Sequence, residues 1–452
     1  MQGIVVLIAV VGAFLTILSL PLSDIHKFFA ELILLGAYGY YLHKRYKIEY
    51  YYGMLMLKTR EGLGEIDKIS KNTRVWQHII DAGTVLSYGA LTLLLFKHVR
   101  VRDFIIGMAT LLIVTVLLLP NLYPVALSVI GLPYEGVSKP LSSSGGAELT
   151  IPLLLIGIML TGLATVITLG LIYQAIITLI GLYMNFFGGT STVVQPGAYL
   201  ILPGINIPFI EGVIALLLLL FVHELAHAVL SRVARIPLKS AGILLFGFIP
   251  IGAFVDPDEK MLLKKPKSDQ TRVIVAGSVA NYALSIASFA MLTLLISLPL
   301  DAYDTGLNVI AAKDGLPIQK GDVIFAINGV EMSSYITYQN YRLGIQPNST
   351  LILTTQRGDI EVQTDENGMI GVLLQPRVKS SFGWYTFLRD LFALLFTLNF
   401  FVGSFNLLPV PLFDGYRLLE LGLDKKWAFL LKAVTILSTA SLVVALLPWL
   451  LR

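Results

Sequence analysis

Long apolar runs separated by short polar segments dominate this chain. A membrane-crossing helix needs about 20 mostly apolar residues, because the hydrocarbon core of a bilayer is about 30 Å thick. The pattern therefore predicts an α-helical polytopic membrane protein with about nine spans. The fifth run is too long for one straight span, so we expect a break or a helical hairpin within it. The expected spans fall at about 3–20, 28–43, 79–96, 104–130, 149–187, 209–232, 272–299, 384–408 and 427–450.

The polar segments between the runs indicate which side of the membrane each end faces. Lys and Arg cluster in residues 44–78 and 260–272, and such short basic loops favour the cytoplasm. The C-terminal end of the 209–232 run is then cytoplasmic, and residues 300–378 lie outside. The basic run 97–103 falls on the outer side in this scheme. Charge alone therefore does not determine the orientation of the spans in the N-terminal half. The first run has no basic region before it and no small-residue cleavage site, so we expect a retained span.

Two segments break the helical pattern. Residues 300–378 alternate short Ile, Val and Thr runs with Asn-Gly and Arg-Gly-Asp turns, which predicts an inserted small β-rich domain. Residues 240–259 are apolar, but Gly242, Gly247 and Gly252 interrupt them. This segment is too broken for a helix and too apolar for a free loop, so we expect a membrane-associated β-hairpin, with a packed interfacial loop as the alternative.

These segments suggest four parts. We expect an N-terminal membrane module of about five spans in residues 1–190 and the two parts of a membrane core in 191–299 and 379–452. The β-rich domain, 300–378, lies between the two parts of the core.

Composition agrees with this picture and excludes some classes. The 452 residues are 56% hydrophobic and 14% charged, against roughly 25% charged in soluble proteins. The net charge is +4 and no dense basic stripe stands apart from the membrane flanks, so we expect no nucleic-acid partner. There is no cysteine, which excludes disulfides and thiolate metal ligands.

Polar residues interrupt the sixth apolar run at FVHELAHAVLSR, residues 221–232. His223 and His227 are four residues apart, so both imidazoles can reach one ion from the same helix face. Glu224 lies within the same arc and can contact a water on that ion. Ionisable groups inside a span cost at least about 2.5 kcal/mol each, and a divalent cation compensates that cost. This is the H-E-x-x-H arrangement of zinc peptidases; the alternative is a polar cluster that hydrogen-bonds between helices.

A catalytic zinc site usually has a third protein ligand. The other histidines, His26, His43, His78 and His98, lie at the ends of apolar runs and are better interpreted as interfacial side chains. Glu31, Asp81 and Asp390 also lie near span ends. Asp414 differs, because it follows two helix-breaking prolines, Pro409 and Pro411, and precedes Gly415. Irregular backbone at membrane depth is tolerated where it lines a cavity, so Asp414 is a good ligand candidate.

Together these motifs resemble the site-2 protease family of intramembrane zinc metallopeptidases (peptidase M50-like), in the archaeal forms that carry a PDZ domain. The resemblance covers about residues 190–450. It rests on the H-E-x-x-H motif, on the N-x-x-P-x-P-x-x-D-G motif of 406–415 and on AGSVAN at 276–281, which is similar to a G-x-x-x-N element. GDVIFAING within 321–329 is similar to a PDZ core, and TREGLGEIDKI more weakly resembles an archaeal membrane module. Phe413 stands where the family often has Leu.

The resemblance implies specific roles. One zinc ion would be held by His223, His227 and Asp414, with Glu224 as the catalytic acid and base. Asn281 and Asn406 would lie near the substrate backbone, although a Gly-x-x-x-Asn step can also simply pack two helices.

The implied activity is regulated intramembrane proteolysis in the cell membrane. Its substrates would be membrane-spanning proteins already shortened by another protease, cleaved toward the cytoplasmic side. Phe248 and Ile251, in the expected hairpin, would help an open strand edge bind the unwound substrate. The PDZ-like domain could bind peptides outside the cytoplasm. The competing class is a non-enzymatic membrane protein, either a metal transporter or a scaffold.

Overall fold

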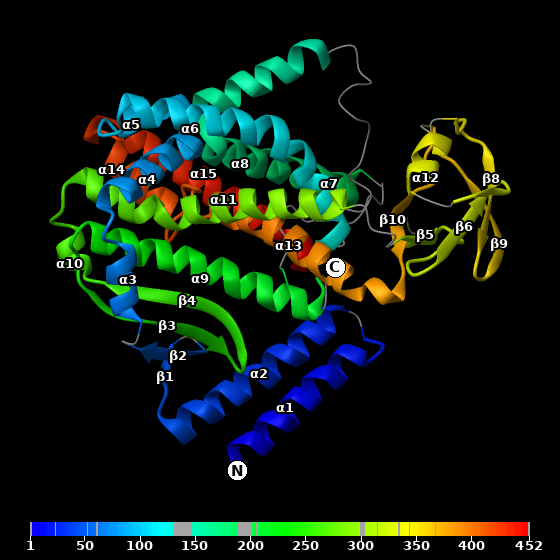
Figure 1. Cartoon of the computed structure of the whole chain (residues 1–452), viewed down its shortest axis with the longest axis horizontal. Helices are drawn as coiled ribbons and strands as arrows, with labels where there is room; N and C mark the ends of the chain where they lie inside the picture. The colour runs from blue at the N-terminus through cyan, green and yellow to red at the C-terminus, as the bar shows by residue number, and fades with distance from the viewer. Residues whose placement is uncertain are drawn as a thin grey trace. The chain divides into compact units, whose positions relative to one another are not determined.

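The structure is a computed structural model. It describes residues 1–452 except 1, 23, 52, 60–61, 131–146, 189–200, 202, 205–206, 299–302, 314, 333–334, 343, 367 and 451–452. The chain forms two compact units (Figure 1). Unit 1 comprises Met1–Leu117, Leu153–Ile286 and Leu398–Arg452, and unit 2 comprises Leu118–Pro152 and Ala287–Thr397.

Helices make up most of the chain. The long ones are α1 (Gln2–Ser19), α2 (Asp24–Tyr46), α4 (Thr73–Tyr88), α6 (Val101–Ile113), α7 (Leu119–Ile130), α8 (Ala147–Phe187), α9 (Phe209–Val233), α11 (Lys267–Ser297), α13 (Gly383–Phe405) and α15 (Ala428–Leu450). The short ones are α3 (Leu63–Ile69), α5 (Thr92–Leu95), α10 (Glu259–Leu262), α12 (Tyr335–Arg342) and α14 (Asp414–Gly422).

Seven helical segments in the described part of the chain are long and apolar enough to cross a membrane. They coincide with the third to ninth expected spans, so the polytopic helical prediction holds for these. The segment Gly3–Ser19 is a shorter apolar helix, and α2 does not meet the same criteria. The seven are Thr73–Leu95, Val101–Ala126, Pro152–Phe187, Phe209–Val233, Lys267–Ser297, Ser380–Phe405 and Lys425–Pro448.

The break expected in the long fifth run occurs at Gly162. Its backbone is not helical, with φ 72° and ψ −179°, and this is the kink in α8, which is drawn as a bent helix in Figure 1. A Cβ at Gly162 would lie 2.4 Å from the carbonyl oxygen of Ser87 and 2.5 Å from the nitrogen of Gly89. Only glycine tolerates both this φ and this close backbone contact.

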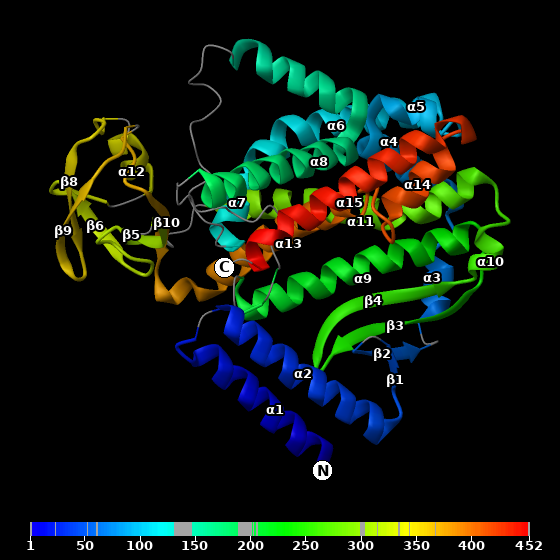
Figure 2. The same ribbon diagram turned by 180° about the vertical axis from the view of Figure 1, so that it is seen from behind.

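The expected hairpin is present as β3 (Leu238–Phe246) and β4 (Ile249–Pro257), which pair antiparallel. Two further strands, β1 (Glu49–Tyr51) and β2 (Met54–Thr59), extend it to a sheet of order β1-β2-β3-β4. In this sheet β4 is an edge strand, and it packs along α9 (Figure 2). The prediction of a polar loop at 44–78 was wrong for β1 and β2. They are short, and β2 pairs with a strand far away in the sequence, so no local pattern marks them.

Unit 2 contains the β-rich domain expected at 300–378. Its sheet has the order β10-β5-β6-β8-β9, with β7 paired to β6, and every pairing is antiparallel. Buried Leu307, Ile324, Ile327 and Leu353 lie in its hydrophobic core. The strands are β5 (Tyr303–Ala312), β6 (Val323–Ile327), β7 (Val330–Glu331), β8 (Thr350–Thr355), β9 (Gly358–Gln363) and β10 (Val372–Val378).

Asp322 ties the turn before β6 to the turn between β8 and β9. Its carboxylate accepts hydrogen bonds from Arg357 Nε at 2.8 Å, Gln356 Nε2 at 3.1 Å and the Gln319 backbone N–H at 2.8 Å. The bond with the Arg357 side chain, helped by these other donors, holds the pKa of the Asp322 carboxyl below its usual range. This acidic residue of the GDVIFAING segment is therefore satisfied by contacts within the domain itself.

Candidate metal centre

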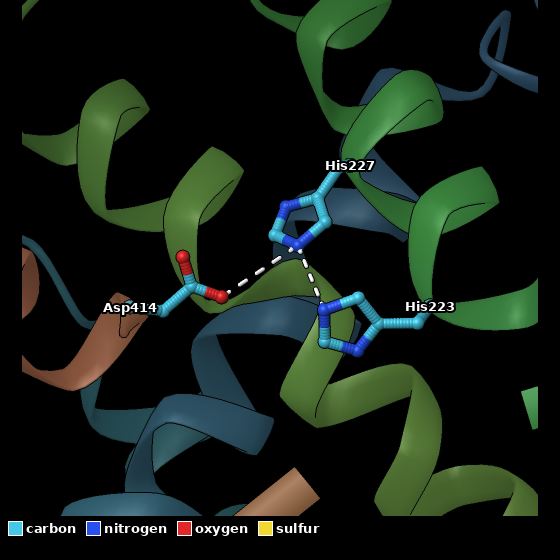
Figure 3. Close-up of side chains that lie close together, drawn as sticks. All are labelled: His223, His227 and Asp414. Atoms are coloured by element: carbon cyan, nitrogen blue, oxygen red, sulfur yellow. Dashed lines mark hydrogen bonds and ion pairs between the residues drawn. The ribbon is translucent and has the colours of Figure 1, made fainter. Parts of the chain in front are cut away.

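His223 and His227 project from one face of α9, as their spacing predicts, and Asp414 approaches them from the first residue of α14 (Figure 3). The two Nε2 atoms are 3.2 Å apart, and Asp414 Oδ2 is 3.7 Å from His227 Nε2. One ligand atom from each residue lies within 4.8 Å of the others. Ligand atoms around one tetrahedral zinc lie roughly 3.3 Å apart, since the bonds are about 2.0–2.2 Å long. The group therefore has nearly the spacing that one ion requires.

The loop before α14 brings Asp414 to the histidines. Leu412 has φ 80°, and the Gly415 N–H donates to the Asn406 carbonyl at 2.8 Å. A Cβ at Gly415 would lie 2.0 Å from the carbonyl oxygen of Leu407, so this tight return of the chain requires glycine. The sequence prediction of a break with a turn at this place is confirmed.

Gly277 on α11 leaves the space in front of the imidazoles open. A Cβ there would lie 2.4 Å from His223 Nε2 and 2.5 Å from His227 Nε2. Any larger residue would fill the volume between the ligand atoms. Two imidazole nitrogens, a carboxylate oxygen and this opening together fit a zinc ion with three protein ligands.

A backbone contact on the far side of its ring orients His227. Its Nδ1 donates to the Val273 carbonyl oxygen at 2.7 Å, and in the neutral imidazole this bond makes Nε2, which faces the other two ligands, the nitrogen that can bind a metal. The residue before Val273 on α11, Arg272, donates two hydrogen bonds of 2.8 Å to Asp81 on α4. Asp81, 1% exposed, is therefore a structural ion-pair partner for α11 rather than a ligand.

Glu224 stands beside the group without belonging to it. Its Oε2 accepts a hydrogen bond of 3.1 Å from the Val255 backbone N–H in β4. In the described part of the chain, the group contains His223, His227 and Asp414 only. Glu31 lies elsewhere, and Asp390 bonds to Arg389 at 2.9 Å. Among the remaining histidines, His43 bonds to the Ile48 carbonyl and His78 to Asp103.

Both asparagines singled out in the sequence lie near His223. Asn406 Nδ2 is 3.4 Å from His223 Nε2. Asn281 is fully buried, and neither of its amide atoms meets hydrogen-bond geometry with a described residue. Gly403 on α13 lets the two helices approach, since a Cβ there would be 3.1 Å from the Asn281 Cβ.

The two hairpin residues occupy different places. Phe248 is in the turn between β3 and β4, with its ring centroid 5.6 Å from that of Phe14 and 6.5 Å from that of Tyr38. Ile251 is in β4, and its side chain lies outside the described residues. Sequence reasoning missed Val255 and Val273. Both act through backbone groups that every residue except proline carries in full, so no side-chain signal could identify them.

Comparison with known proteins places the chain in a family. The sequence model of peptidase family M50 matches residues 211–447. An uncharacterized protein of Methanocaldococcus jannaschii is 28% identical over 248 residues, covering 54% of this chain and 65% of the relative. The chloroplast membrane metalloprotease ARASP of Arabidopsis thaliana is 28% identical over 38% of this chain and 48% of the relative.

The zinc metalloprotease RasP of Geobacillus kaustophilus is 29% identical over 28% of this chain and 33% of its own length. In each case the match spans less than two thirds of the relative. The matched family region, 211–447, contains both helices and the loop that build the group of three residues.

Proposed function

This chain belongs to peptidase family M50, and we propose that it is an intramembrane zinc metallopeptidase of the site-2 protease type. The observation that carries the proposal is that Asp414, from α14, meets His223 and His227, which lie with Glu224 on a helix apolar enough to span a membrane. The two curated relatives described as metalloproteases agree with it.

His223, His227 and Asp414 hold one zinc ion in this proposal. The bound ion supplies Lewis acidity that activates water and polarises the scissile carbonyl. Glu224 takes a proton from the attacking water as the new C–O bond forms and delivers it to the leaving amine as the C–N bond breaks. The Val255 N–H holds the Glu224 carboxylate in place at 3.1 Å, and the Val273 carbonyl holds His227 in the tautomer that can bind the ion.

Asn281 and Asn406 bind the substrate backbone in this proposal. The buried Asn281 amide lies against His223, and none of its contacts with described residues has full hydrogen-bond geometry, so a further partner would stabilise it. An unwound peptide offers the carbonyl and N–H groups that would satisfy it.

A purified protein test addresses the function directly. We expect the protein in detergent to cut a membrane-spanning peptide inside its apolar stretch, a zinc chelator to stop cleavage and added zinc to restore it. Cleavage that is insensitive to chelation would reject a zinc enzyme. Zinc movement across liposomes without any cleavage would instead favour the transporter class.

The free edge of β4 is the proposed binding strand for the substrate. It runs along α9, and its Val255 N–H reaches Glu224, so a peptide added to this edge lies near the base. A helical peptide bond is shielded from attack, and an unwound segment needs new backbone partners.

Proline in β4 tests this role. We expect Ile251→Pro to lower the cleavage rate by roughly tenfold, because it removes a backbone donor and distorts the edge. We also expect Phe248→Gly to lower it, because the Phe248 ring packs on Phe14 and Tyr38 and so anchors the hairpin turn. Glu49→Pro, in β1 at the opposite edge of the sheet, is the matched control. Unchanged cleavage by folded Ile251→Pro protein would remove β4 from the mechanism.

The β-rich domain of unit 2 is proposed to be PDZ-like and to restrict which substrates are cleaved. Its antiparallel sheet with a short helix, α12, and its GDVIFAING segment support this interpretation. Such domains commonly take a peptide as an added strand.

Deleting residues 303–376 tests the restriction. We expect the shortened protein to cleave full-length substrates with bulky outer domains faster than the intact chain does. A substrate already shortened outside the membrane serves as the control and should be cut equally by both proteins. If the two proteins show the same selectivity, the domain has another role.

We also propose nine spans, with α1 and α2 added to the seven, in a cell membrane. The pairing of β2 with β3 and the 2.9 Å ion pair between Asp67 and Arg232 join the basic segment 44–78 to the C-terminal end of α9. These contacts support one shared side for them, which we assign to the cytoplasm from their Lys and Arg content.

A further inference from the structure

An apolar cavity of about 330 Å³ lies at the hairpin turn, away from the metal ligands. Its walls come from α1, α2, α9, the loop before α9, the end of α13 and the two hairpin residues that flank the turn, Phe246 and Ile249. Its volume is at the lower end of the range for ligand-binding cavities. Of the lining residues that the structure describes, twelve are apolar and the thirteenth is Glu31.

Glu31 is the unusual member of this lining. It is only 7% exposed, and its Oε1 is fully buried without a hydrogen-bond partner in the described part of the chain. A buried polar atom left without a partner is destabilising, because it has lost its hydrogen bonds to water. The cavity therefore has the composition of a binding site: mostly apolar walls and a single polar group that fixes a ligand.

The cavity is lined by α9 and by the start of β4, and the same two elements carry the candidate metal ligands and the contact to Glu224. Leu220 and Leu216 precede His223 on α9 by three and seven residues, or about 5–10 Å along a helix. Ile249 precedes Val255, which contacts Glu224, by six residues of β4, or about 20 Å along a strand. An extended peptide on β4 would reach the cavity about three to six residues from its scissile bond.

We propose that this cavity is a side-chain subsite for the substrate segment and that Glu31 selects a neutral hydrogen-bond donor there, such as Thr, Ser or Asn. The inference rests on the proposed function. A neutral donor satisfies the Glu31 oxygen while the rest of the side chain contacts apolar walls. A lipid acyl chain has no donor and leaves Oε1 unpartnered. A charged amine would pair with Glu31 but must lose its hydration in an otherwise apolar cavity, and that cost can exceed the gain from the ion pair.

A peptide series provides the test. Each member carries one Val→Thr replacement, which keeps the side-chain shape, at a different position on either side of the scissile bond. We expect one position, about three to six residues away, at which Thr raises kcat/KM by about tenfold over Val. Glu31→Leu should abolish that preference, and Glu31→Gln should restore part of it through the amide oxygen. Glu65→Leu, at an exposed glutamate of α3, should keep it.

Two outcomes overturn the inference. One is that, at every peptide position, the ratio of kcat/KM for Thr to kcat/KM for Val is the same in wild type and in Glu31→Leu. The other is a crosslinking result. A photo-crosslinking residue is placed at Leu35 of the inactive Glu224→Gln protein, and it captures only lipid and no peptide. Absence of cleavage of any membrane-spanning peptide by wild type would instead defeat the proposed function, and with it the inference. Either of the two outcomes above, seen while cleavage itself is intact, defeats the subsite alone.

Discussion

Replacing Glu224 with glutamine is expected to lower the rate of peptide-bond cleavage by roughly 10²–10⁴-fold while zinc remains bound. Glutamine preserves the shape of the side chain, and its oxygen can still accept the Val255 N–H. It cannot take up the proton of the attacking water. Glu224 is also outside the group of metal ligand atoms, so metal affinity should change little.

Two measurements on the same preparation check this expectation. One is the initial rate on a membrane-spanning peptide, and the other is zinc content per chain. Glu211→Gln, in the first turn of the same helix, is the matched control and should retain activity. Appreciable turnover by the Glu224→Gln variant would contradict the role of Glu224 as the catalytic acid and base. Loss of zinc in that variant would mean that Glu224 acts as a ligand.

Zinc content itself should depend on residues that are nearly 200 positions apart. We expect about one zinc per wild-type chain, from the one group of three candidate ligands found among the described residues. His223→Ala and Asp414→Ala should each weaken zinc binding by more than about 100-fold. Even mutations of residues that only hydrogen-bond to metal ligands lower metal affinity by about 10–100-fold. Metal analysis of detergent-purified protein against a zinc buffer series measures the affinity.

The controls replace the same residue types away from the group. His26→Ala, near the start of α2, and Asp359→Ala, at an exposed position of β9, should keep one zinc. Loss of zinc in the His223 variant alone would leave the third ligand unidentified. No zinc in folded wild type, after zinc has been supplied, would favour the non-enzymatic scaffold.

Local pattern was a good guide wherever one segment carries the whole signal. The apolar runs predicted about nine spans, of which seven are, among the described residues, helices long and apolar enough to cross a membrane. The H-E-x-x-H spacing predicted that His223 and His227 share a helix face. The glycine-punctuated segment predicted the β3–β4 hairpin. In each case helix rise, side-chain periodicity or backbone freedom acts over a few residues, so the sequence alone contains the necessary information.

Sequence and structure were both needed to bring Asp414 together with the histidines. The sequence indicated a broken helix with a turn at Gly415, and resemblance to a family proposed the ligand. The structure adds that Asp414 Oδ2 is 3.7 Å from His227 Nε2, and that Gly277 leaves the space between them open. Asp81 shows the converse: the sequence placed it only near a span end, and the fold pairs it with Arg272.

The sequence by itself therefore determined the membrane helices, the pair of histidines on one face, the hairpin and the β-rich insertion. Only the tertiary structure decided that β2 extends the hairpin, that β4 lies along α9, and that the Val255 N–H and the Val273 carbonyl orient Glu224 and His227. It also decided that Glu31 lines an apolar cavity. Nearly every residue carries a backbone donor and acceptor, and apolar residues pack in many ways, so these partners are fixed by long-range packing and leave no local signature.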